Sequence, residues 1–281
     1  MGNSSVRTRE FGARVRILRE GIGITGTRLA EDLEVVGSTI SRLESGSPHA
    51  IGVSGLTVLL TGCGLRGAKL QKYLSGWTAE DNGYFVAPHG DEIPDKLLAI
   101  MLHEEAATSL FDYEPIFIPG LLQTEGYIRA LFRGAGMSGD GLESAVRLRL
   151  ERQKPLKRES GAPCCTFYVH ENVLRTPVGG KKAMHEQLVK LLIDTGQQSI
   201  NIRVIPAVTQ DVFVPAAFRL MTFDKFGPVG YTSGLGVSAF LEQPGDINRY
   251  LTLLNRLDQA ALSEAHSRDM LDSLERAYGQ P

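Results

Sequence analysis

A short segment near the N-terminus, residues 37–46, places polar side chains where they could bind the edges of DNA bases. On a helix, Ile40 and Leu43 share one stripe that can face a core. The opposite arc then carries small hydroxyl groups and one guanidinium, which can form hydrogen bonds in a DNA groove. We expect Gly46 to end this helix after about two turns, because glycine readily takes the left-handed conformation. The residues expected at the bases are Gly37, Ser38, Thr39, Ser41 and Arg42.

The residues just before this segment predict another short amphipathic helix, over 25–33. Its apolar residues Leu29, Ala30 and Leu33 share one face, and Thr25 is suited to cap its N-terminus. Two short helices with a tight link form a helix-turn-helix, in which the second helix enters the major groove and the first crosses the DNA backbone. From the first helix we expect DNA contacts by Thr25, Thr27 and Arg28.

Together, the two segments resemble the helix-turn-helix of the Cro/phage-repressor (Xre-type) regulators. The resemblance rests on residues 25–33 followed by Ser-Thr-Ile-Ser-Arg-Leu-Glu-x-Gly at 38–46. Gly26 stands where the family usually has Gln, and Val36 stands where it usually has a Ser or Thr cap. The resemblance implies a compact helical domain whose partner is double-stranded DNA.

Histidines beside glutamates could in principle support catalysis or metal binding. His103 and His185 each begin a pattern like that of the zinc-protease helix, but neither has a second histidine one turn further on. His170 and Glu171 could form an acid–base pair in a cleft, although we favour a capping role for them at the next helix. We therefore expect no enzyme, no catalytic residue and no bound metal.

Two Gly-x-Gly-x-x-Gly patterns, at 21–26 and 134–139, could mark nucleotide sites. Such a site needs a strand before the glycines and a helix after them, so that backbone amides face the pyrophosphate. A helical stretch precedes each pattern here. We interpret both as loops and expect no cofactor.

The composition indicates a globular chain with an uneven charge distribution. The 281 residues are 42% hydrophobic and can bury two cores. The net charge of −2 divides into +4 for residues 1–75 and −6 for the remainder, so the N-terminal part suits a polyanion. No stretch of about 18 apolar residues is present, and we expect a cytoplasmic protein without a membrane segment.

We predict an all-α five-helix helix-turn-helix domain followed by an α+β domain with a mixed, largely antiparallel sheet. Residues 1–7 are expected to form a mobile tail, 8–77 the DNA-binding domain, 78–94 a linker and 95–281 the second domain. The linker is rich in helix-breaking residues and contains Tyr84, Phe85 and Val86 as a possible docking segment. Alternatively, the fifth helix continues toward Asn82 and the linker is shorter.

In the second domain the spacing of apolar residues predicts helices near 95–110, 124–133, 140–153, 181–195, 247–261 and 263–277. Strands are expected near 164–169, 200–205, 217–223, 228–233 and 236–241. The last three are so close in sequence that they favour an antiparallel meander. The helix at 181–195 could be a crossover, and we expect the helices to cover one face of the sheet.

Two further features could bind a ligand or partner. The apolar loop 116–122 either packs as core or lines a pocket or groove. The basic run over 147–158 favours a solvated face, or an intradomain network or subunit contact. The residues we assign tentatively to a ligand or partner are Phe117, Pro119, Leu121, Leu122, Gln123, Arg149 and Arg152.

Five motifs in order along the second domain resemble the WhiJ-like regulators. They are the segments 111–125, 147–153, 170–175, 187–188 and 202–206. The resemblance implies a transcriptional regulator, often encoded beside a small partner protein, whose C-terminal domain has no assigned chemistry.

The hypothesis we favour is a sequence-specific DNA-binding regulator whose C-terminal domain dimerises and senses a ligand or a small partner protein encoded nearby. We expect a homodimer, because a single Cro-like module contacts few bases. The alternative is an antitoxin-like or anti-regulator platform that acts mainly by binding a small partner protein. An enzyme ranks third, with His170 and Glu171 as its candidates.

Overall fold

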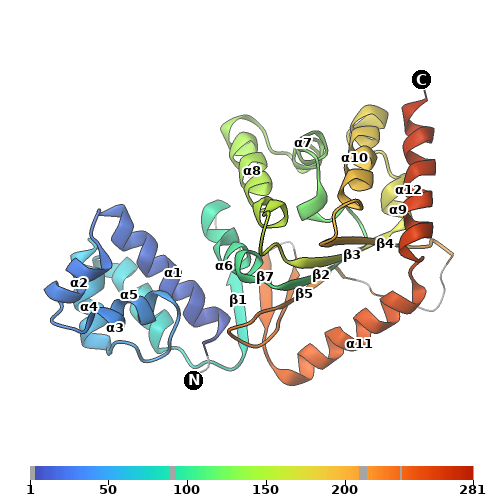
Figure 1. The fold of residues 1–281 in the computed structure, drawn as a ribbon. Helices are drawn as coiled ribbons and strands as arrows, with labels where there is room; N and C mark the ends of the chain where they lie inside the picture. The colour runs from blue at the N-terminus through green and yellow to red at the C-terminus, as the bar shows by residue number, and fades with distance from the viewer. Residues whose placement is uncertain (1–3, 89–92, 209–213, 215, 235, 281) are drawn as a thin grey trace. The chain divides into compact units, whose positions relative to one another are not determined.

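The computed structural model describes residues 4–88, 93–208, 214, 216–234 and 236–280. Contacts divide the chain into two units, Met1–Phe85 and Val86–Pro281, and each unit is described by itself (Figure 1). Residues 1–3 of the predicted tail and 89–92 of the predicted linker lie outside the described residues.

The described residues of the first unit form the five predicted helices. Their apolar stripes meet in one core, in which Val15, Ile40, Leu43 and Leu56 are almost fully buried. This packing explains why such short helices are stable, since isolated helices of this length are marginal in water. The helices are α1 (Val6–Gly21), α2 (Gly26–Asp32), α3 (Gly37–Glu44), α4 (Val53–Gly62) and α5 (Gly67–Thr78).

The first helix begins earlier than the sequence predicts. Ser5 and Thr8 form a capping box, in which the Ser5 hydroxyl accepts from the Thr8 amide at 3.3 Å and the Thr8 hydroxyl accepts from the Ser5 amide at 2.9 Å. Val6 follows the cap and is fully buried. The prediction of a mobile tail is therefore wrong for residues 4–7, because capping and burial hold them in place.

The second unit contains a seven-stranded mixed sheet with the order β1-β7-β6-β5-β2-β3-β4. This arrangement confirms the predicted α+β class and the largely antiparallel pairing. The strands are β1 (Tyr84–Pro88), β2 (Ser109–Glu114), β3 (Cys164–His170), β4 (Ile200–Ile205), β5 (Phe218–Thr222), β6 (Val229–Ser233) and β7 (Val237–Leu241). The division between the two units falls inside β1.

Helices alternate with the parallel strands and follow the antiparallel ones. They are α6 (Ile93–Ala106), α7 (Glu125–Gly134), α8 (Gly139–Glu151), α9 (Glu171–Arg175), α10 (Gly180–Asp194), α11 (Pro244–Ala260) and α12 (Glu264–Gly279), with short 3-10 turns η1 (Gly120–Leu122) and η2 (Lys154–Lys157). β2 pairs in parallel with β3, and β3 with β4, so α10 is the crossover that the sequence predicts. β5, β6 and β7 form the predicted antiparallel meander.

Helices cover both faces of the sheet, which corrects the prediction of one covered face. Tyr113 of β2 and Phe218 of β5 pack on one face against α11, through residues such as Leu257. Side chains alternate along a strand, so Asp112 and Arg219 project to the opposite face. In Figure 1, α11 lies on one side of the strands, while α7, α8 and α10 lie on the other.

Two strands differ from the sequence prediction. β2 begins at Ser109, within the predicted helix 95–110, because α6 already ends at Ala106. β1 lies in the predicted linker and includes Tyr84, Phe85 and Val86. The predicted docking segment is thus an edge strand of the sheet.

Candidate nucleic-acid interface

The helix-turn-helix is formed by α2 and α3. Leu29 and Ala30 of α2 are buried in the same core as Ile40 and Leu43 of α3. Glu34, in the left-handed region with a φ of 52°, reverses the chain between the two helices. Each helix buries one apolar stripe, and the link between them is short. The polar faces of α2 and α3 are therefore both exposed, as the sequence predicts.

The predicted base-reading residues lie on the solvent side of α3. Gly37, Ser38, Ser41 and Arg42 are exposed, and Thr39 is half-buried. Arg42 forms no side-chain hydrogen bond or ion pair with any residue that the structure describes. Its guanidinium is therefore available to an external acceptor, and its contact with DNA stays a prediction.

On α2, the Thr25 hydroxyl caps the helix by accepting from the Arg28 amide at 3.2 Å. Thr27 and Arg28 are exposed, as a role at the DNA backbone would require. The Arg28 guanidinium also lies 3.0 Å from a carboxylate oxygen of Asp32 on the same helix. A phosphate would have to compete with this exposed pair, which is weak in water.

An ion pair that the sequence analysis missed fixes the end of α3. Arg19 of α1 donates from Nη2 to Oε2 of Glu44 at 3.0 Å, and from Nη1 to the Ile24 carbonyl at 2.7 Å. The hydrogen bond to Glu44 raises the pKa of Arg19, so the guanidinium stays charged. One side chain thus joins α1, α3 and the loop before α2. Its two partners are far apart in sequence, and no local pattern indicates the pairing.

Two glycines allow α1 to contact the end of α3 closely. A Cβ at Gly12 would lie 2.3 Å from the Leu43 carbonyl oxygen, closer than any real contact. Gly46 has a φ of 81°, and a Cβ there would lie 2.6 Å from the backbone of Arg9. Gly46 ends α3 as predicted, with its amide donating to the Leu43 carbonyl at 3.0 Å.

In the second unit, the structure separates the tentative partner residues into two groups. Phe117 is 40% exposed and Ile116 beside it is 64% exposed. Pro119, Leu121, Leu122, Gln123 and Arg152 are buried. These buried residues therefore form no exposed partner surface in this conformation, and the core interpretation of the loop applies from residue 118 onward. A ligand role for them and for the half-buried Arg149 stays a prediction.

Three buried glutamines hold the turn at η1. Gln123 donates to the Ile118 carbonyl at 2.7 Å, Gln153 to the Gln123 carbonyl at 2.8 Å, and Gln187 to the Leu122 carbonyl at 2.8 Å. A buried backbone carbonyl without a partner is costly, so these amides stabilise an otherwise irregular segment. Sequence patterns did not indicate this role for Gln153 and Gln187.

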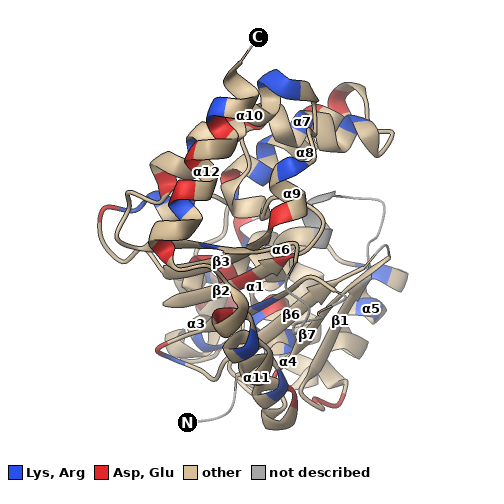
Figure 2. Ribbon diagram, turned by 90° about the vertical axis from the view of Figure 1, so that its right-hand side faces the viewer, with Lys and Arg blue, Asp and Glu red and all other residues tan. Residues whose placement is uncertain are grey.

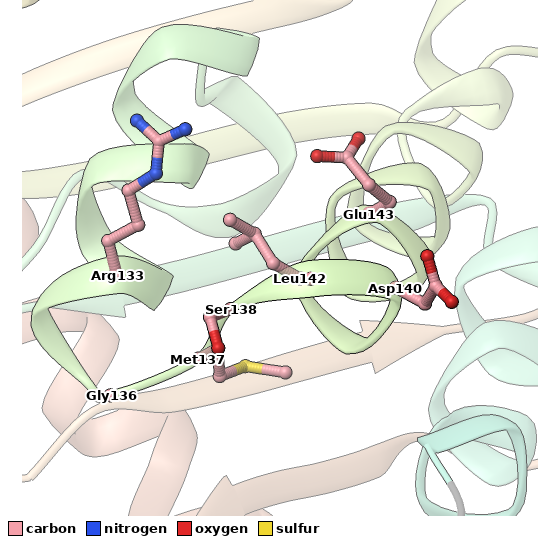
Figure 3. Close-up of a pocket in the computed structure, with 8 residues that line it drawn as sticks. Arg133, Gly136, Met137, Ser138, Asp140, Leu142 and Glu143 are labelled. Carbon is pink, nitrogen blue, oxygen red and sulfur yellow. The ribbon is translucent and has the colours of Figure 1, made fainter.

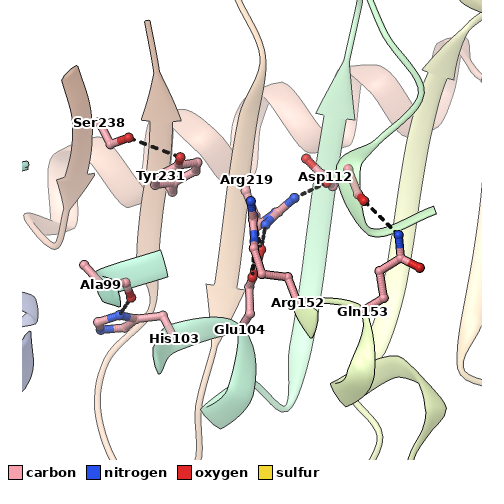
Figure 4. Close-up of polar contacts among 10 residues, drawn as sticks. Ala99, His103, Glu104, Asp112, Arg152, Gln153, Arg219, Tyr231 and Ser238 are labelled. Atoms are coloured by element: carbon pink, nitrogen blue, oxygen red, sulfur yellow. Dashed lines mark hydrogen bonds and ion pairs between the residues drawn. The ribbon is translucent and has the colours of Figure 1, made fainter. Parts of the chain in front are cut away.

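A buried charge cluster joins the helices to the sheet (Figure 4). Arg152 of α8 donates to Glu104 of α6 at 2.9 and 2.6 Å, while Arg219 of β5 bonds to both Glu104 and Asp112. Burial alone would raise the pKa of Glu104, but the charges of Arg152 and Arg219 lower it overall. The basic run at 147–158 is thus partly an intradomain network, one of the roles considered for it.

The other motifs of the second unit have structural roles. The His170 ring accepts from the Asn172 amide at 3.2 Å, which confirms the capping role, and Glu171 accepts from the Ala207 amide at 2.9 Å. The glycine pattern at 134–139 is the turn between α7 and α8, so the loop interpretation is confirmed. This turn borders a pocket lined by Arg133, Gly136, Met137, Ser138, Gly139, Asp140, Leu142 and Glu143 (Figure 3).

Comparisons with known proteins agree with the two units. Residues 97–273 match the Domain of unknown function (DUF5753), and the chain belongs to this family. Residues 10–72 match a Helix-turn-helix domain. No curated protein and no solved structure matches the chain. With the geometry of α2 and α3, the second match indicates a DNA-binding regulator. No described helix is long and apolar enough to cross a membrane.

Proposed function

We propose that this chain is a sequence-specific transcriptional regulator of the Xre type that reads DNA with α3. The observation that carries this proposal is the exposed polar face of α3, opposite a stripe buried in the core. Residues 37–42 would read base edges, whereas Thr25, Thr27 and Arg28 would contact phosphates. The excess of four positive charges in residues 1–75 supports binding to a polyanion.

The second unit would supply dimerisation and a signal. A single helix-turn-helix reads a short half-site, and pairing of two copies extends the site. Acidic and basic residues alternate along α10 and α12 (Figure 2), so these helices offer no uniform basic surface for DNA. We therefore assign the second unit to dimerisation and to sensing a ligand or a small partner protein encoded nearby.

A second candidate function is a platform that binds a small partner protein, in the manner of an antitoxin or anti-regulator. The exposure of Ile116 and Phe117 favours it, because neighbouring exposed apolar side chains often mark a binding surface. A neighbour-encoded protein would then co-purify with the wild-type chain and be lost from Phe117→Asp. Val237→Asp, at another exposed apolar residue, is the matched control.

We also propose that the chain has no enzymatic role. His170 and Glu171 are the titratable pair that the sequence offered for catalysis. Each makes a hydrogen bond that serves the backbone, and Glu171 also pairs with Arg175 at 2.7 Å. These contacts support a structural role for the pair.

The experiment that tests DNA reading is a salt series. The affinity of the full chain for its own promoter region is compared with that for an unrelated duplex of equal length, from about 50 to 300 mM salt. We expect tighter binding to the promoter at every salt concentration and a steep loss of affinity for both duplexes as salt rises. Equal affinity for the two duplexes would overturn sequence-specific reading and favour the partner platform.

A further inference from the structure

Six charged side chains gather at the face of the sheet that α6 and α8 cover, near the C-terminal end of β2. Four of them, shown in Figure 4, pair among themselves as described above. The remaining two are Glu114, the last residue of β2, and Arg149 of α8. Neither forms a hydrogen bond or ion pair with a residue that the structure describes. The charge of each nevertheless shifts the pKa of the other, so the two groups lie within electrostatic reach.

The charges of this cluster do not balance at neutral pH. Burial, together with the charge of Asp112, raises the pKa of Glu114 to about 8, so its carboxyl holds a proton. Burial raises the pKa of Asp112 as well, against the opposing charge and hydrogen bond of Arg219. Burial, together with the charge of Arg152, lowers the pKa of Arg149 to about 10, which still leaves it charged. Three arginines then face at most two carboxylates, and Arg149 is the arginine that has no carboxylate partner among the described residues.

The guanidinium of Arg149 packs closely against two neighbouring residues. Its central carbon lies 5.4 Å from the centroid of the Phe132 ring, a cation–π distance. On another side is Gly120, where a Cβ would come within 2.2 Å of the Arg149 Nη1 atom. A side chain at position 120 would therefore displace the guanidinium from the place it has here. Arg149 is half-buried, so part of its side chain is in contact with solvent.

Another polar group in the same turn is buried and has one atom without a hydrogen-bond partner. Gln123 is 2% exposed, and its Oε1 atom has no hydrogen-bond partner among the described residues, although its Nε2 atom donates to the Ile118 carbonyl. A buried acceptor without a donor is unfavourable, so this atom calls for a donor such as a water molecule; a carboxylate ligand has no proton to donate and does not bind it. The C-terminal ends of parallel strands are also where open sheets of this kind commonly bind ligands.

We propose that Arg149 and Glu114 form a binding site for a small monocarboxylate ligand, whose carboxylate pairs with the Arg149 guanidinium and accepts a hydrogen bond from the Glu114 carboxyl. A carboxylate matches the planar fork of arginine. Its single negative charge also matches the one arginine of the cluster, Arg149, that has no carboxylate partner among the described residues. A phosphate dianion would leave an excess negative charge beside Asp112 and Glu104. This inference rests on the proposed function, since it names the class of ligand that the second unit senses.

The test uses the full-length chain and benzoate as the probe, because its ring can pack beside Phe132. Thermal unfolding and titration calorimetry are measured with benzoate, with neutral benzamide and with inorganic phosphate, up to about 20 mM. We expect benzoate to raise the melting temperature and to give a saturable heat, and the other two compounds to give neither. No effect of benzoate, or an equal effect of all three compounds, would overturn the proposal.

Variants test which residue binds the probe. Arg149→Gln should weaken benzoate binding at least about tenfold, whereas Arg149→Lys should keep part of it because the charge is retained. Arg147→Gln is the matched control, since Arg147 is exposed on the same helix. Unchanged binding by Arg149→Gln would reject the site. If Arg149→Gln does not fold, the benzoate affinity of Arg149→Lys is compared with that of the wild type instead, under conditions in which the two proteins are equally stable.

Benzoate binding should also depend on pH. Glu114 lies within electrostatic reach of Asp112 on β2, Arg219 on β5, and Arg149 and Arg152 on α8, and its charge also acts on Tyr127 of α7. As the pH rises through about 8, Glu114 ionises, neutralises Arg149 and repels the ligand. The wild-type affinity should therefore fall at least about fivefold between pH 7 and 9. Glu114→Gln should bind with an affinity independent of pH, and the same fall in this variant would contradict the assignment.

Promoter binding by the wild-type chain without benzoate is measured in parallel. Specific DNA binding without any response to benzoate would reject the ligand site and leave the regulator intact. Benzoate binding by a chain that does not distinguish its promoter from other DNA would support the ligand site and reject sequence-specific DNA reading.

Discussion

Arg19 and Glu44 join the last turn of α1 to the last turn of α3 through paired hydrogen bonds, one of them 3.0 Å long. Both side chains are largely buried, so the pair is shielded from solvent. The orientation of the recognition helix thus depends on a contact outside the predicted DNA face. Stability and DNA binding of the first unit should therefore change together when this contact is altered.

Replacing Glu44 by Gln should destabilise the first unit by on the order of 1–3 kcal/mol, because the buried Arg19 loses its anionic partner. The single tryptophan, Trp77, packs in this core and reports its unfolding in urea by fluorescence. Glu31→Gln, at an exposed position, is the control and should leave the midpoint almost unchanged. Equal midpoints for the two variants would show that the pair does not stabilise the domain.

Substitution of Gly12 by Ala should force α1 away from the carbonyls at the end of α3. Overpacking at backbone of this kind costs roughly 1–3 kcal/mol, and the displaced α3 should lose affinity for the promoter. Gly21→Ala in the same helix has open space around its Cβ and serves as the control. Urea unfolding and promoter titrations check both effects. A Gly12→Ala chain as stable as Gly21→Ala would mean that the close contact is not maintained in solution.

Arg42→Ala should weaken promoter binding by roughly 1–3 kcal/mol if Arg42 contacts a base or a buried phosphate. Arg249→Ala removes the same charge from a highly exposed position in the second unit and should have little effect. Fluorescence anisotropy at fixed salt compares the two. Because Arg42 is exposed and unpaired among the described residues, its loss should not change the stability of the domain. An unchanged affinity would remove Arg42 from the interface.

Glu104→Gln should destabilise the second unit by roughly 3–5 kcal/mol, since it leaves Arg152 and Arg219 without their shared buried carboxylate. Glu105 is its neighbour on α6 but is exposed, and its pair with Arg158 is near the surface. Glu105→Gln should therefore cost less than about 1 kcal/mol. Thermal unfolding followed by circular dichroism separates the two cases. Similar melting temperatures for both variants would argue against the buried cluster.

The stability of the second unit should decrease as the pH rises from about 5 to about 8. Glu114 has a folded-state pKa of about 8 because of burial and the charge of Asp112, whereas an unfolded glutamate titrates near its ordinary value of about 4.3. Between these values the folded chain binds a proton that the unfolded chain has released, and so a rise in pH favours unfolding.

Glu114→Gln removes this titration. Compared with wild type, it should be about equally stable near pH 5 and more stable by roughly 4 kcal/mol near pH 9. Urea unfolding at both pH values provides the measurement. If the two proteins differed by the same free energy of unfolding at both pH values, the pKa of Glu114 would not be raised.

The helices of the first unit could be predicted from sequence because each has a local apolar stripe and a local stop. The seven-residue α2 illustrates this, with Thr25 as its cap and Leu29 and Ala30 as its buried face. By contrast, Ser5 and Thr8 show a capping box with threonine at the position usual for Glu or Gln. Because threonine stands where the usual pattern has Glu or Gln, the sequence did not predict that residues 4–7 are ordered.

The central strand β2 was not predicted because it follows α6 after two residues and continues its apolar character. Its buried residues include Asp112, a polar residue that a strand pattern would place in solvent. The reason for its burial is Arg219, which lies 107 residues away. Likewise, the basic run on α8 gave no sign that Arg152 is inside the domain, since Glu104 is 48 residues away.

The order in which the sheet is synthesised has a consequence for biogenesis. β2 leaves the ribosome early, but one of its edges stays unpaired until β5 has been made about a hundred residues later. The helix-turn-helix is complete by then and can fold first. A nascent chain arrested between β4 and β5 would therefore carry a folded DNA-binding module attached to an open, aggregation-prone strand edge. Once synthesis has passed Arg219, β5 can pair with that edge of β2, and Arg219 can pair with the carboxylates of Glu104 and Asp112.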